Sequence, residues 1–138
     1  MNIISLHNIN NARFNPSQVI RDNNEVIMYE ENGEVKALAS IQFNYFGLNE
    51  CYIAYITSAE KSYGARLLQY INNEYDKVVL MCAPRAEHSL CAYYRKQNMS
   101  EIMIYSKTHN NIVSFFYKGI KGKEIRNALN KKYNGEKL

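Results

Sequence analysis

Hydrophobic and polar positions along the first half of the chain follow the pattern of paired β-strands. Residues 25–31 and 35–44 are rich in β-forming side chains, and Asn32-Gly33 lies between them. Asn-Gly between two such segments favours a two-residue type I′ turn. A further turn follows at "FGLN", and "ECYIAYIT" over residues 50–57 predicts a third strand. This half is therefore expected to form an antiparallel meander.

Two short elements are predicted before the meander. Residues 2–6, "NIISL", favour a strand. Asn15 is a good helix N-cap and Pro16 suits the first helical position, so a short helix is expected from Pro16 to Asp22.

The spacing changes to that of a helix after the third strand. In "SYGARLLQYINNEY" the apolar side chains recur every three or four positions. Those on one face are Leu67, Leu68, Ile71 and Tyr75. "KVVLMCA" over residues 77–83 is a continuous apolar run, typical of a strand covered on both faces. Because a strand–helix–strand unit joins parallel strands through a right-handed crossover, residues 50–57 and 77–83 are expected to pair in parallel.

The remaining chain predicts a second helix in "AEHSLCAYYRKQNM", a hairpin and a last helix. "EIMIYSK" and "IVSFFYKG" favour strands on either side of a turn at residues 109–111, and the charged tail favours a helix that frays at Gly135. The expected fold class is α/β, with one domain over residues 1–138. Its sheet is mixed, with about six or seven strands and flanking helices. Ligands of such sheets bind at the carboxyl ends of the parallel strands, which places a candidate site at residues 57–64.

Composition restricts the class of protein without defining its function. The 138 residues are 46% hydrophobic and 22% charged, as in ordinary globular domains, and the net charge of +4 suits an anionic ligand. The chain shows no secretory leader and no apolar run of the roughly 20 residues that cross a bilayer, so a cytoplasmic location without a membrane partner is expected. Its three cysteines, Cys51, Cys82 and Cys91, form no CxxC pair. We expect buried free thiols and no metal site.

The loop before the first long helix is a candidate anion site. A helix that begins near Ser62 presents unpaired backbone N–H groups and the positive end of its dipole, and a pyrophosphate fits there if no side chain blocks it. Gly64 and Ala65 are small, and Lys61 and Arg66 carry positive charge. The alternative is structural, with Ser62 as an N-cap and Gly64 as a glycine at a helix start.

The segments "YITSAEKSYGARLLQYI" and "LCAYYRKQNM" together resemble the GNAT family of acyl-CoA-dependent N-acetyltransferases. "YITSAEKSYGARLLQYI" resembles the family's loop pattern Q/R-x-x-G-x-G/A followed by paired leucines, with Gly64 on the last glycine. "LCAYYRKQNM" resembles the family's A-x-x-F-Y-x-x-x-G-F, with Tyr94 on the tyrosine and Asn98-Met99 in place of Gly-Phe. With the strand order, the resemblance covers roughly residues 24–118. The loop departs from the pattern at Ala59 and Ser62, which replace the basic or Gln residue and the first glycine.

The resemblance implies acetyl transfer from acetyl-CoA to a primary amine by direct attack in a ternary complex. Backbone groups of the third strand would hold the pantetheine arm, and the loop and helix start would hold the pyrophosphate. The implied cofactor-binding residues are Ala54, Tyr55, Ile56, Thr57, Lys61, Ser62, Tyr63, Gly64, Ala65 and Arg66. Tyr94 is the implied general acid, and Glu50 is a candidate base, with a strand-end structural role as its alternative. The acceptor could be a small amine, a protein lysine or a protein N-terminus.

Two further classes of function remain open. One is a GNAT-like binding or regulatory module that uses CoA poorly or not at all, favoured by the departures in the loop. The other is a small basic nucleic-acid-binding protein, suggested by the lysines of residues 118–132. Nucleic acid is the less favoured partner because the basic residues are dispersed and no RRM, KH or helix-turn-helix signature is present. Exposed edges of a mixed sheet make a homodimer conceivable.

Overall fold

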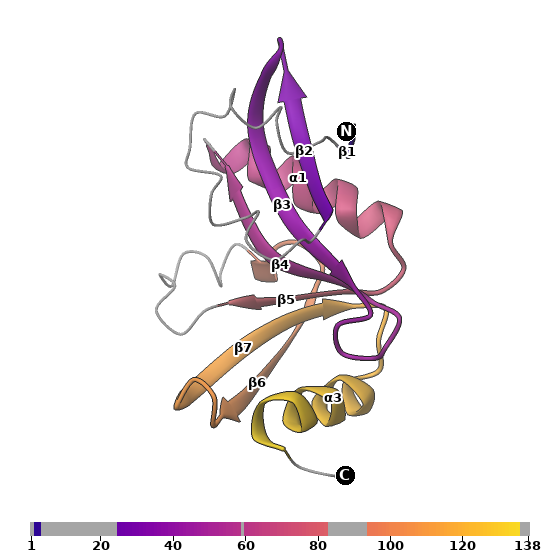
Figure 1. Cartoon of the computed structure of the whole chain (residues 1–138), viewed down its shortest axis with the longest axis vertical. Helices are drawn as coiled ribbons and strands as arrows, with labels where there is room; N and C mark the ends of the chain where they lie inside the picture. Colours follow the sequence, from indigo (N-terminus) through magenta and orange to yellow (C-terminus); the bar gives the residue numbers. More distant parts are fainter. Residues whose placement is uncertain (1, 4–24, 59, 83–93, 136–138) are drawn as a thin grey trace. The chain divides into compact units, whose positions relative to one another are not determined.

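The computed structural model describes residues 2–3, 25–58, 60–82 and 94–135 of the chain. Within these residues the elements follow one another as in Figure 1. They are β1 (Asn2–Ile3), β2 (Glu25–Glu31), β3 (Glu34–Phe43), β4 (Cys51–Ser58), α1 (Lys61–Glu74), β5 (Val78–Cys82), β6 (Ser100–Ser106), β7 (Asn111–Lys118) and α3 (Gly122–Asn134).

The strands form one mixed sheet in the order β1-β2-β3-β4-β5-β7-β6. β4 and β5 are the parallel neighbours that α1 joins, while β1–β2, β2–β3, β5–β7 and β6–β7 pair antiparallel. This arrangement confirms the predicted fold class. By packing, the chain divides into two compact units, the first made of Met1–Gln42 with Ile53–Glu74 and the second of Phe43–Tyr52 with Tyr75–Leu138. The prediction of a single domain stays a prediction.

The first unit is built on the β2–β3 hairpin and α1. Asn32 and Gly33 form its turn with φ of 56° and 76°, which confirms the predicted tight turn at Asn-Gly. Residues 37–41 of β3 are buried without interruption, so this strand is covered on both faces. The apolar face of α1 is fully buried through Leu67, Leu68 and Ile71, as its spacing predicted. Tyr75 lies beyond the end of α1 and is half-buried.

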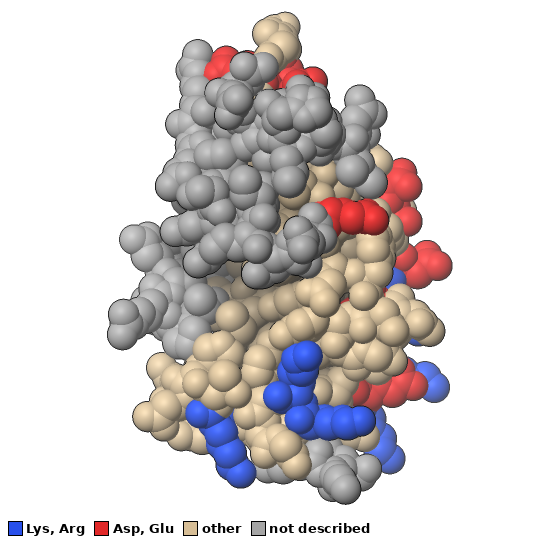
Figure 2. All heavy atoms as spheres, in the orientation of Figure 1, with Lys and Arg blue, Asp and Glu red and all other residues tan. Residues whose placement is uncertain are grey.

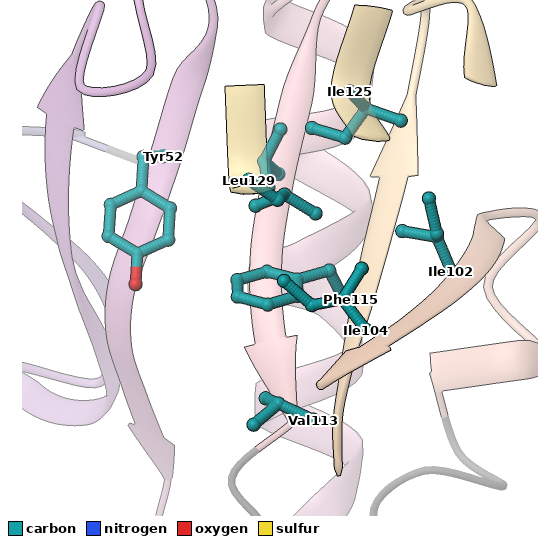
Figure 3. Packing of buried hydrophobic residues seen from close by; sticks show 8 residues of the cluster. Tyr52, Ile102, Ile104, Val113, Phe115, Ile125 and Leu129 are labelled. Atoms are coloured by element: carbon teal, nitrogen blue, oxygen red, sulfur yellow. The ribbon is translucent and has the colours of Figure 1, made fainter. Parts of the chain in front are cut away.

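The second unit places α3 against one face of the β5–β7–β6 strands. Ile125 and Leu129 extend from α3 and pack in a cluster with Phe115 of β7 and with Ile102 and Ile104 of β6 (Figure 3). The neighbouring side chain Phe116 is fully buried on the opposite face, because successive residues of a strand point to opposite sides.

A close backbone contact closes the second unit where β7 ends. Gly119 has φ of 77°, and a Cβ atom added there would lie against the carbonyl oxygen of Asp76. Lys118 Nζ donates to the carbonyl oxygen of Tyr75 at 2.7 Å. Only glycine combines this backbone conformation with this contact.

One predicted feature is wrong, and several others fall outside the residues that the structure describes. The first strand is described at residues 2–3 only, and the rest of that prediction, the helix from Pro16 to Asp22 and most of the second helix lie outside the described residues. Cys51 is a buried thiol as predicted, but Cys82 is disulfide-bonded, so the prediction of free thiols is wrong for Cys82. α3 ends at Asn134, and Gly135 adopts the left-handed conformation with its N–H on the carbonyl of Asn130, which explains the predicted helix end.

Candidate functional site

The junction of β4 and α1 brings the predicted anion-binding residues together. β4 ends at Ser58 and α1 begins at Lys61. A Cβ atom added to Gly64 would lie 2.9 Å from Ser58 Oγ and 3.5 Å from Ser58 Cβ. The missing side chain therefore lets the first turn of α1 approach the end of β4. Ser58 is a residue that sequence reasoning missed, and no local pattern identifies it.

The backbone N–H groups of Lys61 and Ser62 lie at the start of α1, where a helix has no regular acceptor for them. The N–H groups of Tyr63 and Gly64 both donate to the carbonyl oxygen of Glu60, at 3.1 and 3.4 Å. The first four N–H groups of a helix have no regular intrahelical acceptor; here they belong to residues 60–63, and the Gly64 bond to Glu60 is the first regular bond of α1. The first turn of α1 contains no acidic residue, and Ser62 is exposed. An anion at this end would meet two N–H groups, one hydroxyl and the helix dipole.

Arg66 is directed to β2 by its contacts. Its Nη1 donates to Tyr29 Oη at 3.0 Å and lies 3.6 Å from Glu31 Oε2. The hydrogen bond to Tyr29 raises the pKa of the guanidinium, which stays charged. Tyr63, one turn earlier, donates to Glu31 Oε1 at 3.5 Å, and the Lys36 ammonium lies 5.6 Å from its ring centroid. Arg66 and Tyr63 therefore attach α1 to the β2–β3 hairpin.

The exposure of β4 changes along its length. Cys51, Tyr52 and Ile53 are buried. The four predicted pantetheine-binding residues that follow are exposed or half-buried: Ala54, Tyr55, Ile56 and Thr57. The carboxyl half of β4 thus leaves surface accessible to a ligand.

Tyr94 is buried in the second unit. Its side chain is 8% exposed and its ring centroid lies 5.4 Å from that of Phe116. Burial raises the pKa of the phenol above its usual value, so the group is protonated at neutral pH. The segment is tied to β6, because Arg95 Nε and Nη2 donate to the two carboxylate oxygens of Glu101 at 2.7 and 3.0 Å. Asn98 has φ of 58°, the conformation predicted for the position where the family pattern has glycine.

Glu50 lies just before β4 and is fully buried. Its Oε1 accepts the N–H of Leu48 at 3.0 Å and its Oε2 accepts that of Phe46 at 3.3 Å. The carboxylate therefore organises the turn over residues 44–49. The predicted catalytic base thus occupies a position with a visible structural role.

A tyrosine cluster in the second unit was not predicted. Tyr45 stacks on Tyr52 with ring centroids 4.7 Å apart, Tyr52 and Tyr133 are hydrogen-bonded, and the Lys132 ammonium lies 3.9 Å from the Tyr45 ring centroid. Burial raises the pKa of Tyr52 to about 12 and also raises the pKa of Tyr133 above its usual value. The high tyrosine content, 12 residues, was the only signal in the sequence.

Most basic residues of the tail lie on α3 or at its N-cap, Lys121, whereas Lys118 ends β7. Figure 2 shows Lys and Arg side chains gathered over α3. Lys121, Lys123, Arg126, Lys131 and Lys132 are all exposed. In the part of the chain that the structure describes, we find no group of three His, Cys, Asp or Glu side chains able to hold a metal ion, and no helix with the length and hydropathy of a membrane span.

Comparison with known proteins identifies the class of fold. A GNAT-family acetyltransferase from Bacillus cereus superposes with a TM-score of 0.64 at 12% identity, over 87% of this chain and 96% of that one. A Bacillus subtilis acetyltransferase in complex with CoA gives 0.56 at 11% identity, over 77% and 82%. The ribosomal-protein-S18-alanine N-acetyltransferase of Escherichia coli gives 0.53 at 15% identity, over 78% and 77%.

No family profile and no curated protein sequence matches the chain. The chain therefore has the fold of the GNAT acetyltransferases, and the resemblance inferred from the two sequence segments is confirmed at the level of the fold.

Proposed function

We propose that this protein is an acetyl-CoA-dependent N-acetyltransferase acting on a primary amine. The observation that carries the proposal is the start of α1 at Lys61, close behind the accessible half of β4, which ends at Ser58, in a chain with the GNAT fold. Solved structures of this fold contain CoA. A helix start in this position suits the pyrophosphate of that cosubstrate.

In the proposed complex, the pyrophosphate is bound by the N–H groups of Lys61 and Ser62 and by the Ser62 hydroxyl. Gly64 supports this geometry by allowing α1 to approach Ser58. The pantetheine amides pair with backbone groups of Ala54 to Thr57 in the manner of an added strand. Arg66 and Tyr63 act indirectly, because their side chains are committed to the β2–β3 hairpin.

The proposed reaction is a single displacement. The neutral amine forms a bond to the thioester carbonyl carbon, and the carbonyl oxygen gains negative charge, which a backbone N–H of β4 can stabilise. Collapse of this intermediate breaks the carbon–sulfur bond and releases the CoA thiolate. Tyr94 donates its proton to the thiolate, and Glu50 accepts the proton lost by the amine. The products are the acetylated amine and CoA.

A second candidate is a GNAT-like binding module without turnover. It is favoured by a specific observation: Tyr63 directs its N–H group to the carbonyl oxygen of Glu60, so one of the four N–H groups that a helix start leaves without a regular acceptor is already engaged. A module of this kind would bind CoA weakly and show no acetyl transfer.

A thermal melting experiment tests the proposal. Acetyl-CoA at 100 times its dissociation constant should stabilise the folded protein by about 2.7 kcal/mol, whereas pantetheine, which lacks the pyrophosphate, should stabilise it less. Ser62→Asp places a negative charge at the helix start and should abolish the shift caused by acetyl-CoA. Asn73→Asp makes the same charge change in the last turn of α1 and should leave that shift intact.

Three results separate the candidates. If millimolar acetyl-CoA does not change the melting temperature, both the acetyltransferase and the CoA-binding module are contradicted. A shift without acetylation of any amine favours the binding module. An equal loss of the shift in both aspartate variants would show that Ser62 has no specific part in binding.

A further inference from the structure

The last turn of α3 occupies part of the outer edge of β6. Among the described strands, β6 pairs with β7 and stands last in the sheet. Asn134 Nδ2 donates to the carbonyl oxygen of Tyr105 at 2.7 Å, and Asn134 Oδ1 accepts the N–H of Lys107 at 2.7 Å. A carbonyl and the N–H two residues further on are the groups that a residue of a neighbouring parallel strand would bind. The Asn134 carboxamide therefore stands where a further strand would pair with β6.

These hydrogen bonds also identify which backbone groups of β6 face outward. Successive residues of a strand direct their N–H and C=O groups to opposite edges. Because Tyr105 faces outward, Met103 and Glu101, two and four positions earlier, face outward as well. The chain turns just before the strand at Asn98, which has φ of 58°. The part of the edge that α3 leaves open is thus limited to residues 100–104.

Asn134 is held in this position by its own helix and by the β6–β7 turn. Its Nδ2 also donates to Asn130 Oδ1 at 3.1 Å, so the orientation of the carboxamide is fixed from both sides. Thr108 Oγ1 donates to the carbonyl oxygen of Tyr133 at 3.2 Å, and the rings of His109 and Tyr133 lie 5.4 Å apart by their centroids. The end of α3 is therefore attached to the hairpin at several points.

The sequence of β6 gives this edge little protection of its own. The strand "SEIMIYS" contains no proline, glycine or lysine, and its one charged residue, Glu101, forms an ion pair with Arg95. Such short apolar segments with little net charge pair readily with copies of themselves. Natural proteins prevent this with charges, prolines or bulges, or by covering the edge with another element. In β6 the covering element is the end of α3.

We propose that the last turn of α3 is an edge cap, which keeps β6 from pairing with a second copy of this chain. An antiparallel pair of two β6 strands centred on Met103 sets Glu101 of one copy opposite Tyr105 of the other. A strand about 4.8 Å from β6 would take the place of the Asn134 carboxamide, so a cap on either copy blocks the pair. Residues 100–104 alone give too short an overlap. The inference is independent of the proposed acetyl transfer.

Sedimentation velocity over a concentration series tests the cap. The wild-type chain should stay monomeric. Asn134→Leu removes both hydrogen bonds to β6, and it should dimerise with an association constant at least about tenfold above that of wild type. Asn127→Leu is the matched control, because Asn127 is also a half-buried asparagine of α3. It should stay monomeric at the same concentrations.

A charge placed at the centre of the expected pair identifies the surface that associates. Met103→Lys, added to Asn134→Leu, sets two ammonium groups opposite each other across the symmetry axis and should restore the monomer. Ile112→Lys, added to Asn134→Leu, puts the same charge on β7, which is not at the edge, and should leave the dimer intact. Met103 is 61% exposed and Ile112 60%, so neither lysine has to enter the core.

Hydrogen exchange in the wild-type chain tests the cap without any substitution. The N–H of Lys107 belongs to the turn after β6 and is bound by Asn134, whereas the N–H of Met103 faces the open part of the edge. The Lys107 amide should therefore exchange at least about tenfold more slowly than the Met103 amide.

Three sedimentation results would overturn the inference. They are a wild-type chain that dimerises as strongly as Asn134→Leu, a folded Asn134→Leu chain that stays monomeric, and a dimer that Met103→Lys does not disrupt. If melting curves show that Asn134→Leu does not fold, the exchange rates decide. Slow exchange at Lys107 then supports the cap, and equal rates at Lys107 and Met103 contradict it. The acetyl-CoA melting shift of the wild type is a separate measurement, so the proposed function stands or falls apart from these results.

Discussion

At the scale of single residues, the environment of Tyr94 determines how it could act. The phenol is buried, and its raised pKa keeps it protonated where an ordinary tyrosine near pH 10 would be half ionised. If Tyr94 donates the proton to the thiolate, Tyr94→Phe should lower kcat about 100-fold without reducing the acetyl-CoA melting shift. The decline of the wild-type kcat at alkaline pH should occur at a higher pH than an ordinary tyrosine would give, because burial raises the Tyr94 pKa. An unchanged kcat in the variant would remove Tyr94 from the reaction.

Glu50 combines a proposed chemical role with an evident structural one. Glu50→Gln keeps a carbonyl oxygen that can accept the N–H of Leu48 but cannot take a proton from an amine. If the carboxylate is the base, kcat should fall at least about tenfold at neutral pH while the melting temperature falls only slightly. Measurements of kcat and melting on the same preparation decide the matter. A large loss of stability with unchanged kcat per folded molecule would leave Glu50 as the organiser of the turn over residues 44–49.

Tyr52 makes the stability of the fold depend on alkaline pH. Its folded pKa of about 12 lies above the ordinary value of 10.0, so between these pH values the unfolded chain loses this proton and the folded chain keeps it. The stabilisation is fully present below pH 10 and is lost as the pH rises toward 12, by about 2 kcal/mol. Urea denaturation at pH 9 and pH 11.5 should show this decrease in wild type. Tyr52→Phe should show a smaller decrease, and an identical one would contradict the assignment.

A comparison of Gly33 with Gly119 distinguishes the stability cost of backbone strain from that of a steric clash. Gly33 and Gly119 have nearly equal φ values of 76° and 77°, but a Cβ atom at Gly33 meets nothing within 4 Å, whereas one at Gly119 meets the Asp76 carbonyl. Gly33→Ala should cost about 1–2 kcal/mol, the usual penalty of a left-handed alanine. Gly119→Ala should cost at least about 2 kcal/mol more, because the close contact is added to the same strain. Equal losses in urea denaturation would show that the loop of Asp76 relaxes freely.

At the scale of elements, local signals in the sequence were sufficient for most of the secondary structure. All five non-glycine residues with positive φ in the described chain are asparagines, and they mark turns or helix ends at Asn32, Asn44, Asn49, Asn98 and Asn110. The apolar spacing also placed the buried face of α1 correctly. Such features depend on neighbours a few positions away, so the sequence displays them directly.

The details of the candidate site depend on distant contacts, and these were not predictable. Arg66 supplied positive charge to the expected anion site, yet its partners are Tyr29 and Glu31 on β2. Gly64 was expected to clear space for a ligand, and the structure shows that it also clears space for Ser58. Neither contact has a periodic or adjacent signal in the sequence, because each arises from how α1 packs on the strands.

At the scale of the whole molecule, charge is distributed unevenly along the chain. Residues 121–134 contain five basic residues and one acidic residue, and their difference of four equals the net charge of the entire protein, +4. Lys121 and Lys123 also lie at the start of α3, where positive charge is unfavourable to the helix dipole. This helix is therefore the feature on which a nucleic-acid-binding function would depend.

A salt titration distinguishes that function from nonspecific attraction. A helix with five cations should bind single-stranded RNA weakly, with an affinity that falls about 100-fold between 50 and 200 mM salt. Replacing Lys121, Lys123 and Lys131 with Gln should remove this binding and leave the acetyl-CoA melting shift unchanged, because these residues are not part of the proposed cosubstrate site. Gel-shift assays at both salt concentrations measure the first effect. Tight binding that resists salt and depends on RNA sequence would contradict the expectation and assign α3 a nucleic-acid partner.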